Sequence, residues 1–187
     1  MALFVARTDG VLDRYANMLA AAQHPERALQ RALSRTGDKA KTQVIRALTV
    51  QTGLKRKVIV RAVKVKKPSF RLLEYSMTTR GGDVSLKYFD PRETRSGVSA
   101  APRGNRQIFA HTFLKGGLFP NRVPLSMGGH VFERAAGARR TPIHKRKSGV
   151  YIPQEMVRGE TLDAFNNVIA RDLPDRVGHE LLRMLGG

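Results

Sequence analysis

The first third of the chain has apolar residues at helical spacing. In residues 9–23 the apolar side chains on one helical face are Val11, Leu12, Tyr15, Met18, Leu19 and Ala22. Asp9 precedes them as a favourable N-cap, so the pattern predicts an amphipathic helix. A longer apolar stripe runs from Pro25, a residue favoured in the first helical turn, to Gly53, a residue favoured just after a helix.

Within this longer stripe, Gly37 costs a helix about 1 kcal/mol relative to Ala. It marks either a break or a close backbone contact, and we favour one continuous helix. Residues 54–65 fit a helix by spacing and a strand by their β-branched residues. A short helix is favoured there, with a strand as the open alternative.

From Phe70 onward the apolar period changes to two. Residues 70–79 and 83–89 are predicted to form a hairpin around Gly81 and Gly82, and residues 108–114 resume strand character. Residues 130–135 and 140–143 are a further predicted pair that turns at Ala136 and Gly137. The stretch near 90–107 is rich in Gly, Pro, Ser and charge, which predicts a long exposed arm or a hairpin, and the stretch near 114–129 is a further loop that we expect to form a second arm.

The C-terminal segment 161–187 has a second long apolar stripe. Its members are Leu162, Phe165, Ile169, Leu173, Val177, Leu181 and Leu185. Pro174 is expected to kink this helix or split it in two. The order of helices, then strands, then a helix predicts an α+β fold. We expect a single domain over residues 1–187, with N-terminal helices and a C-terminal helix packed on a small antiparallel sheet with long loops or arms.

Charge adds the strongest indication of a partner. The 187 residues include 34 Lys and Arg against 15 Asp and Glu, a formal charge of +19. Residues 51–150 hold 22 basic and 5 acidic side chains, whereas residues 151–187 hold 4 basic and 6 acidic ones. Such a basic middle is typical of a chain with a polyanionic neighbour.

Composition and spacing also exclude several kinds of chemistry. The chain has no Cys, so disulfides, thiolate zinc sites and cysteine nucleophiles are excluded. No phosphate-binding loop, nucleophile elbow or paired acidic motif is present. Of the five His residues, only His130 and His144 lie in one region with a nearby Glu133, at a spacing that fits no metal motif. We therefore expect no enzyme activity, no metal and no cofactor.

The N-terminal sequence MALFVARTDG lacks the pattern of a signal peptide, and no apolar run approaches the roughly 20 residues of a membrane span. We expect a soluble chain with no membrane partner.

The basic residues gather in three clusters. They are Lys55, Arg56 and Lys57, then Lys64, Lys66 and Lys67, then Arg139, Arg140, Lys145, Arg146 and Lys147. Such clusters are either solvated faces and subunit salt bridges or contacts to phosphate groups, which give salt-sensitive and sequence-independent affinity. Both interpretations stay open. No pattern for sequence-specific recognition is present.

Several blocks of sequence occur in a characteristic order. They are RALQRALSRTGDKAKTQVIRAL, LKRKVIVRAV, FRLLEYSM, VSLKYFDPRETRSGVSA, IFAHTFL, GGHVFERAAGARRTPI and YIPQEM. This order resembles the minor tail protein Z family of long-tailed bacteriophages and their prophages, over roughly residues 25–185. The most specific parts are residues 85–99, residues 109–113 and the pairing of GHVFERA with RRTPI. The family usually has an apolar residue between the Arg and the Pro, where this chain has Thr141.

The resemblance implies a virion structural protein of the neck and upper tail, assembled in the host cytoplasm. Such a protein forms a homo-oligomeric ring that contacts tail terminator or tail-tube proteins and head connector or stopper proteins. Double-stranded DNA would pass through its lumen without sequence recognition. A six-fold ring matches a six-fold tail, and a twelve-fold ring is the alternative beside a connector.

The resemblance also divides the candidate residues into two groups. The three basic clusters are the candidates for facing DNA in the lumen. The candidates for contacts between subunits are Phe89, Arg92, Arg95, Phe109, Phe113, Phe132, Pro142 and Ile143. The alternative function is that of a general basic protein that binds nucleic acid independently of sequence. It would need base-stacking aromatic residues among the cations, and the sequence does not group them so.

Overall fold

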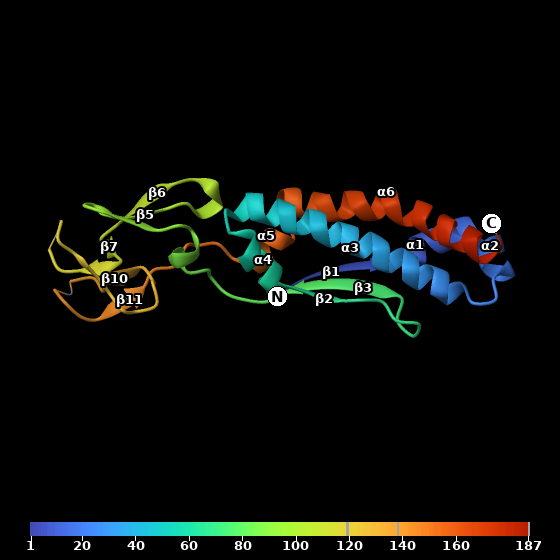
Figure 1. Cartoon of the computed structure of the whole chain (residues 1–187), viewed down its shortest axis with the longest axis horizontal. Helices are drawn as coiled ribbons and strands as arrows, with labels where there is room; N and C mark the ends of the chain where they lie inside the picture. The colour runs from blue at the N-terminus through green and yellow to red at the C-terminus, as the bar shows by residue number, and fades with distance from the viewer. Residues whose placement is uncertain (119, 138, 187) are drawn as a thin grey trace.

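A computed structural model of the chain describes residues 1–118, 120–137 and 139–186. The molecule is elongated, with two long helices along one half and a group of short strands at the opposite end (Figure 1). We call residues 1–82 and 150–186 the body, and the described residues of 83–149 the head. The fold is α+β, as the sequence predicts.

Two antiparallel helices form the backbone of the body. They are α3 (Pro25–Thr52) and α6 (Gly159–Met184), which lie side by side along most of their lengths. Most residues of the apolar stripes predicted from the sequence lie on the buried faces of these helices, whereas Leu185 lies beyond the end of α6 and is 43% exposed. Gly53 ends α3 in the left-handed conformation, with φ of 71°. Pro174 lies inside α6 without ending it, so of the two effects expected of this proline, a kink or a split, the split does not occur.

A three-stranded antiparallel sheet packs against these helices. Its strands are β1 (Ala2–Arg7), β3 (Glu74–Thr79) and β2 (Val63–Lys66), in that spatial order. Alternate residues of β1 are buried, and Phe4 stacks on Phe165 of α6 with ring centroids 4.5 Å apart. No strand is predicted from the sequence over residues 2–7, although β1 forms one edge of the sheet.

Gly37 marks a close contact and not a break. A Cβ atom built on Gly37 would lie 2.3 Å from Cδ2 of Tyr75, a fully buried residue of β3. The Tyr75 hydroxyl donates a hydrogen bond of 2.9 Å to Oδ1 of Asp38. Because Gly37 has no side chain, α3 can lie directly against the tyrosine ring.

The remaining helices of the body are short. They are α1 (Asp9–Leu12), the 3-10 turn η1 (Asp13–Tyr15), α2 (Ala16–Ala21), α4 (Arg56–Ala62) and α5 (Ile152–Met156). The helix predicted over residues 9–23 is therefore broken into three pieces. The ambiguous segment 54–65 contains both structures that its pattern allowed, because α4 ends at Ala62 and β2 begins at Val63.

The head consists of small antiparallel sheets. One contains β4 (Arg92–Thr94), β5 (Gly97–Ala100) and β6 (Gln107–Ala110), and another contains β7 (Thr112–Phe113), β10 (Phe132–Arg134) and β11 (Ile143–Lys145). The predicted pairing of residues 130–135 with the segment around Ile143 is confirmed by the β10–β11 register. The predicted hairpin of 70–79 with 83–89 is wrong. Residues 86–88 form the 3-10 turn η2 (Leu86–Tyr88), and β3 pairs with β1 and β2 instead.

The two predicted arms differ. The segment 90–107 contains the hairpin of the two alternatives, since β4 pairs with β5, and it is folded against the molecule, because β5 is buried at every position and η3 (Pro102–Gly104) contacts the end of α3. The segment 114–129 contains the short pair β8 (Lys115–Gly116) and β9 (Val123–Pro124), and Glu93 ties it to the rest of the head through Arg122 and the Leu114 amide. It exposes Leu118 by 88% and Val123 by 68%.

The chain joins body and head at several places. The chain passes from the body into the head after β3. It contacts α3 of the body at η3, continues through the head from β6 onward, and re-enters the body at Val150. At this junction Glu155 of α5 is almost fully buried, and its carboxylate accepts hydrogen bonds from Arg103 (3.1 Å), Gln51 (2.9 Å) and Arg158. Within the described ranges, none of the helices is apolar over a length that would cross a membrane.

Candidate nucleic-acid interface

The predicted basic residues of the body lie on an exposed surface around β2. Lys55, Arg56 and Lys57 lie at the start of α4, and Lys64 and Lys66 alternate in β2 with the more buried Val63 and Val65. We call these five cations the β2 surface. Lys67 is different, because its Nζ pairs with Asp38 of α3 at 2.8 Å.

That ion pair belongs to a network around Asp38. Burial alone would raise the pKa of Asp38, but the hydrogen bonds from Lys67 and Tyr75 outweigh it, so the pKa is lowered. Burial and the hydrogen bond to Asp38 raise the pKa of Tyr75. Lys67 therefore links the end of β2 to α3, and its charge is less available for a phosphate group than the charges of the β2 surface.

The predicted basic residues of the head lie on the β10–β11 hairpin. Arg139, Arg140, Lys145 and Lys147 are exposed, and we call them the hairpin surface. Arg146 lies among them in sequence but pairs with Glu133 across the hairpin at 2.9 Å, with its guanidinium 6.0 Å from the ring of Phe109. Arg146 thus stabilises the hairpin internally.

The predicted subunit-contact residues are divided between the interior and the surface. Phe89 and Phe132 are buried, with exposures of 2% and 3%, so in this structure a neighbour would not reach their side chains. Phe109, Phe113 and Ile143 are half-buried. Arg92, Arg95 and Pro142 are exposed. The sequence pattern could not separate these cases because an apolar residue in a short strand points either to the core or away from it.

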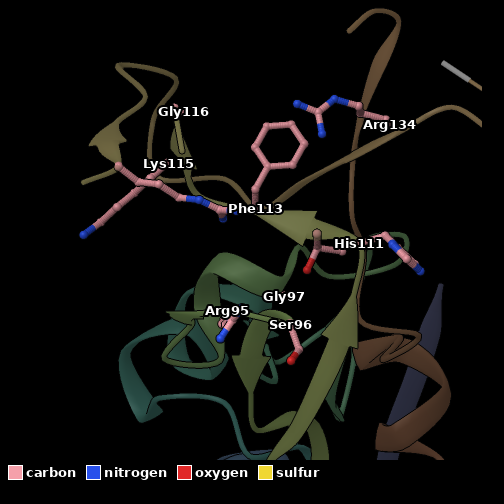
Figure 2. A pocket seen from close by; sticks show the side chains of 11 residues that line it. Arg95, Ser96, Gly97, His111, Phe113, Lys115, Gly116 and Arg134 are labelled. Atoms are coloured by element: carbon pink, nitrogen blue, oxygen red, sulfur yellow. The ribbon is translucent and has the colours of Figure 1, made fainter. Parts of the chain in front are cut away.

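A cleft in the head brings together cations that lie far apart in the sequence. It has a volume of about 260 Å³ and is lined by Arg95, Ser96, Gly97, His111, Thr112, Phe113, Lys115, Gly116, Gly117, Arg122 and Arg134. We call it the distal cleft. Figure 2 shows Phe113 between Lys115 and Arg134, with Arg95 and Ser96 near the strand below. The Arg134 guanidinium lies 5.1 Å from the centre of the Phe113 ring.

The backbone at His111 brings these residues together. His111 has φ of 59°, a left-handed conformation that is uncommon for a residue other than glycine. It ends β6 and begins the turn into β7, so the strand predicted over residues 108–114 is in fact two strands in two sheets. A signal for the cleft was nevertheless present, because no carboxylate occurs between Glu93 and Glu133 in the sequence.

The acidic side chains of the head are all engaged internally. Asp83 accepts hydrogen bonds from the backbone of Ser148 and Gly149, and Asp90 pairs with Arg92 and Arg106. Glu93 binds Arg122 and the amide of Leu114, and Glu133 binds Arg146.

This leaves a set of cations in the head that form no ion pair within the residues that the structure describes. They are Lys87, Arg95, Lys115, Arg134, Arg139, Arg140, Lys145 and Lys147. Because the available carboxylates are already used, these positive charges are balanced only by solvent ions or by a partner.

His130 is near a serine but does not form a nucleophilic pair with it. Its Nδ1 lies 3.0 Å from Ser85 Oγ, and its Nε2 lies 3.3 Å from Lys87 Nζ. Burial and the charges of Lys87 and Lys145 lower the pKa of His130, which favours the neutral ring. Lys87 can only donate, so Nε2 accepts and Nδ1–H donates to Ser85. The histidine therefore takes no proton from Ser85. No group of three or more His, Asp or Glu suited to a metal ion occurs among residues 1–118, 120–137 and 139–186.

Comparisons with known proteins do not assign a function to the chain, so the β2 surface, the hairpin surface and the distal cleft are the basis for a proposal. No protein-family model, no curated protein and no solved structure matches the chain. The resemblance to the minor tail protein Z family therefore rests on the order of its sequence blocks alone.

Proposed function

We propose that the chain is a virion structural protein of a phage neck or upper tail. It assembles into a ring that completes the tail, joins it to the head connector and surrounds the DNA conduit. Its partners in this proposal are other copies of itself, tail terminator or tail-tube proteins, connector or stopper proteins, and duplex DNA.

The observation that carries the proposal is the set of unbalanced cations in the head. The head holds 13 basic and 4 acidic side chains, and each of those carboxylates has an internal partner. A surface of this kind attracts a polyanion without recognising its sequence, because each phosphate that it neutralises releases counterions. The lining of a DNA channel requires this property.

The exposed segment 114–129 supports the assembly part of the proposal. It carries Leu118, Val123 and Met127 as exposed apolar side chains. The segment itself lies at the end of the elongated molecule (Figure 1). A closed ring joins one patch of each subunit to a different patch of the next, so a projecting apolar segment suits such a contact. This segment therefore joins the half-buried Phe109 and Phe113 as a candidate for subunit contacts.

The proposal is tested by native mass spectrometry and negative-stain microscopy of the purified chain, alone and mixed with tail-tube or terminator protein. We expect closed rings, or rings that form when the tail protein is added. A Leu118→Ser/Val123→Ser variant should lose the ring while remaining folded. Monomers that bind DNA tightly and never associate with tail proteins would instead establish the general nucleic-acid-binding function.

A second experiment separates DNA contacts from subunit contacts on the hairpin surface. Arg139, Arg140, Lys145 and Lys147 are replaced by Gln, and Arg146 is kept because it binds Glu133. If these side chains face DNA, particles should assemble but retain or eject their genome abnormally. Failure of assembly would place the hairpin surface at a protein contact.

A further inference from the structure

The distal cleft is a site that the basic clusters of the sequence do not include. Four of its lining residues, Arg95, Lys115, Arg122 and Arg134, are cations drawn from separate segments of the head. No carboxylate is among its described lining residues. A cleft that collects positive charge without lining carboxylates is suited to an anionic ligand.

The nearest carboxylate is already committed. Glu93 is almost buried, and it binds Arg122 through Oε1 and the Leu114 amide through Oε2 at 2.7 Å. This pairing fixes Arg122 at the wall of the cleft. Arg95 and Lys115 are exposed and form no ion pair with another residue of the described ranges. Arg95, Lys115 and Arg134 are thus available to a ligand, and Arg122 lies beside them in a position fixed by Glu93.

The aromatic residue in the cleft does not offer a stacking surface for bases. Phe113 is half-buried, its ring centre lies 6.3 Å from that of Phe132, and the Arg134 guanidinium lies 5.1 Å from it over one face. A protein that stacks bases needs exposed ring faces. The cleft therefore suits the backbone of a nucleic acid and not its bases.

We infer that the distal cleft binds phosphodiester groups of the duplex DNA backbone, through Arg95, Lys115 and Arg134, with Ser96 as a neutral donor beside them. The inference rests on the proposed function for the identity of the polyanion. It goes beyond that function in assigning the contact to a particular site, and in moving Arg95 from the predicted subunit contacts to the DNA contacts. Because phosphates are the same in every sequence, binding here is independent of sequence.

The test measures the affinity of the full chain for two labelled 30-base-pair duplexes of different sequence, over a series of salt concentrations. The cleft variant is Arg95→Gln/Lys115→Gln/Arg134→Gln, all exposed positions. The matched control is Arg27→Gln/Arg31→Gln/Arg46→Gln, which removes the same charge from exposed positions of α3. Thermal unfolding of each variant checks that the fold is kept.

We expect the cleft variant to bind both duplexes at least about tenfold more weakly and to lower the salt slope by about 2–3, since each lost phosphate contact removes about one. The control should change affinity by less than about threefold, through net charge alone. A charge-conserving variant, Arg95→Lys/Lys115→Arg/Arg134→Lys, should retain most of the binding. Equal weakening by the cleft and control variants, or unchanged binding by the cleft variant, overturns the inference.

Native mass spectrometry of the same variants keeps the two proposals distinguishable. Rings that form normally from a cleft variant with weak DNA binding support both proposals. Normal DNA binding with loss of rings would mean that the cleft receives acidic side chains of a neighbouring protein, which overturns the inference and leaves the proposed function standing. A wild-type chain that forms no ring but loses DNA affinity in the cleft variant would overturn the proposed function and keep the cleft as a phosphate site.

Discussion

Gly37 is the residue at which the long helix and the sheet come closest. The Tyr75 ring occupies the space where a Cβ atom would be, and Tyr75 is held by its hydrogen bond to Asp38. An alanine favours a helix by about 1 kcal/mol over glycine, but overpacking a core costs about 1–3 kcal/mol. At Gly37 the second effect should be the larger, because the neighbouring ring is fully buried and cannot move aside.

We therefore expect Gly37→Ala to lower the free energy of unfolding by about 1–2 kcal/mol. Gly10→Ala is the matched control, because Gly10 lies in helix α1 and a Cβ there meets nothing within 4 Å. Denaturant titration of both variants measures the difference. A Gly37→Ala protein as stable as the control would show that the ring does not restrict this position.

Glu155 gives the molecule a specific sensitivity to acid. Burial alone would raise the pKa of Glu155, but hydrogen bonds from Arg158, Gln51 and Arg103 outweigh it and lower the pKa. The folded carboxyl therefore holds its proton less readily than the unfolded one. Its contribution to stability is present above the ordinary value of 4.5 and is lost as the pH falls through the lowered folded value.

Glu155→Gln should destabilise the protein at pH 7 by roughly 1–3 kcal/mol, because charge-assisted hydrogen bonds at a buried site become neutral. It should also flatten the fall in stability below about pH 4.5 relative to the wild type. Unfolding midpoints measured from pH 7 downward test both effects. Glu160→Gln, at an exposed position nearby, should leave the profile unchanged; the same acid dependence in wild type and Glu155→Gln would assign it to other groups.

The strand β1 presents alternate residues to two different environments. Phe4 is buried against Phe165, while Leu3 is 47% exposed on the opposite face of the same strand. We expect Phe4→Ala to lower the free energy of unfolding by about 3–5 kcal/mol, the usual cost of removing a buried aromatic side chain. Leu3→Ala should cost less than about 1 kcal/mol, since little apolar surface is lost from the core. Equal effects in chemical denaturation would contradict the observed register of β1 on β3.

The helices were predictable from the sequence because their apolar stripes are long. Residues 24–53 and 161–187 repeat the helical period over many turns, so the buried faces of α3 and α6 could be assigned. Residues 54–65 fitted both the helical period and the strand period, and the chain forms helix α4 there, followed directly by strand β2. Residues 2–7 and 83–89 were too short for their alternation to tell a strand from a turn, so β1 was missed and the second hairpin strand was wrong.

The candidate site was predictable only in part, for a related reason. Clusters such as Arg139 and Arg140 are adjacent in sequence, and they are exposed in the structure. Arg95, Lys115 and Arg134 lie far apart in sequence and meet only because His111 turns the chain between two sheets. Likewise, the ion pair of Lys67 depends on Asp38, which is distant in sequence. The ion pair of Arg146 depends on Glu133, which lies on the opposite strand of the hairpin.

At the scale of the whole molecule, the head is fitted closely to the end of α3. Gly53, at φ of 71°, lies so near η3 that a Cβ would be 2.5 Å from the Gly104 amide nitrogen and 2.9 Å from the Ala101 carbonyl oxygen. Gly104 has φ of 75°, and a Cβ there meets nothing within 4 Å. The two glycines share a backbone conformation but differ in their surroundings.

This pair isolates the contact between body and head. Gly104→Ala should cost only the left-handed conformation, about 1–2 kcal/mol. Gly53→Ala should cost at least about 1 kcal/mol more, because backbone atoms of η3 must shift. Calorimetric unfolding of both variants tests the difference. Similar losses in the two variants would mean that η3 moves freely relative to α3.

The repeated passage of the chain between body and head has a mechanical consequence. A head on a single tether would swivel, and a pull on it would be absorbed by that tether. Here a pull on the segment 114–129 is shared by the links at residues 80–85, at η3 and at Val150, which reach β3, α3 and α5. Displacement of the tip is therefore opposed at three places on the body and not at one.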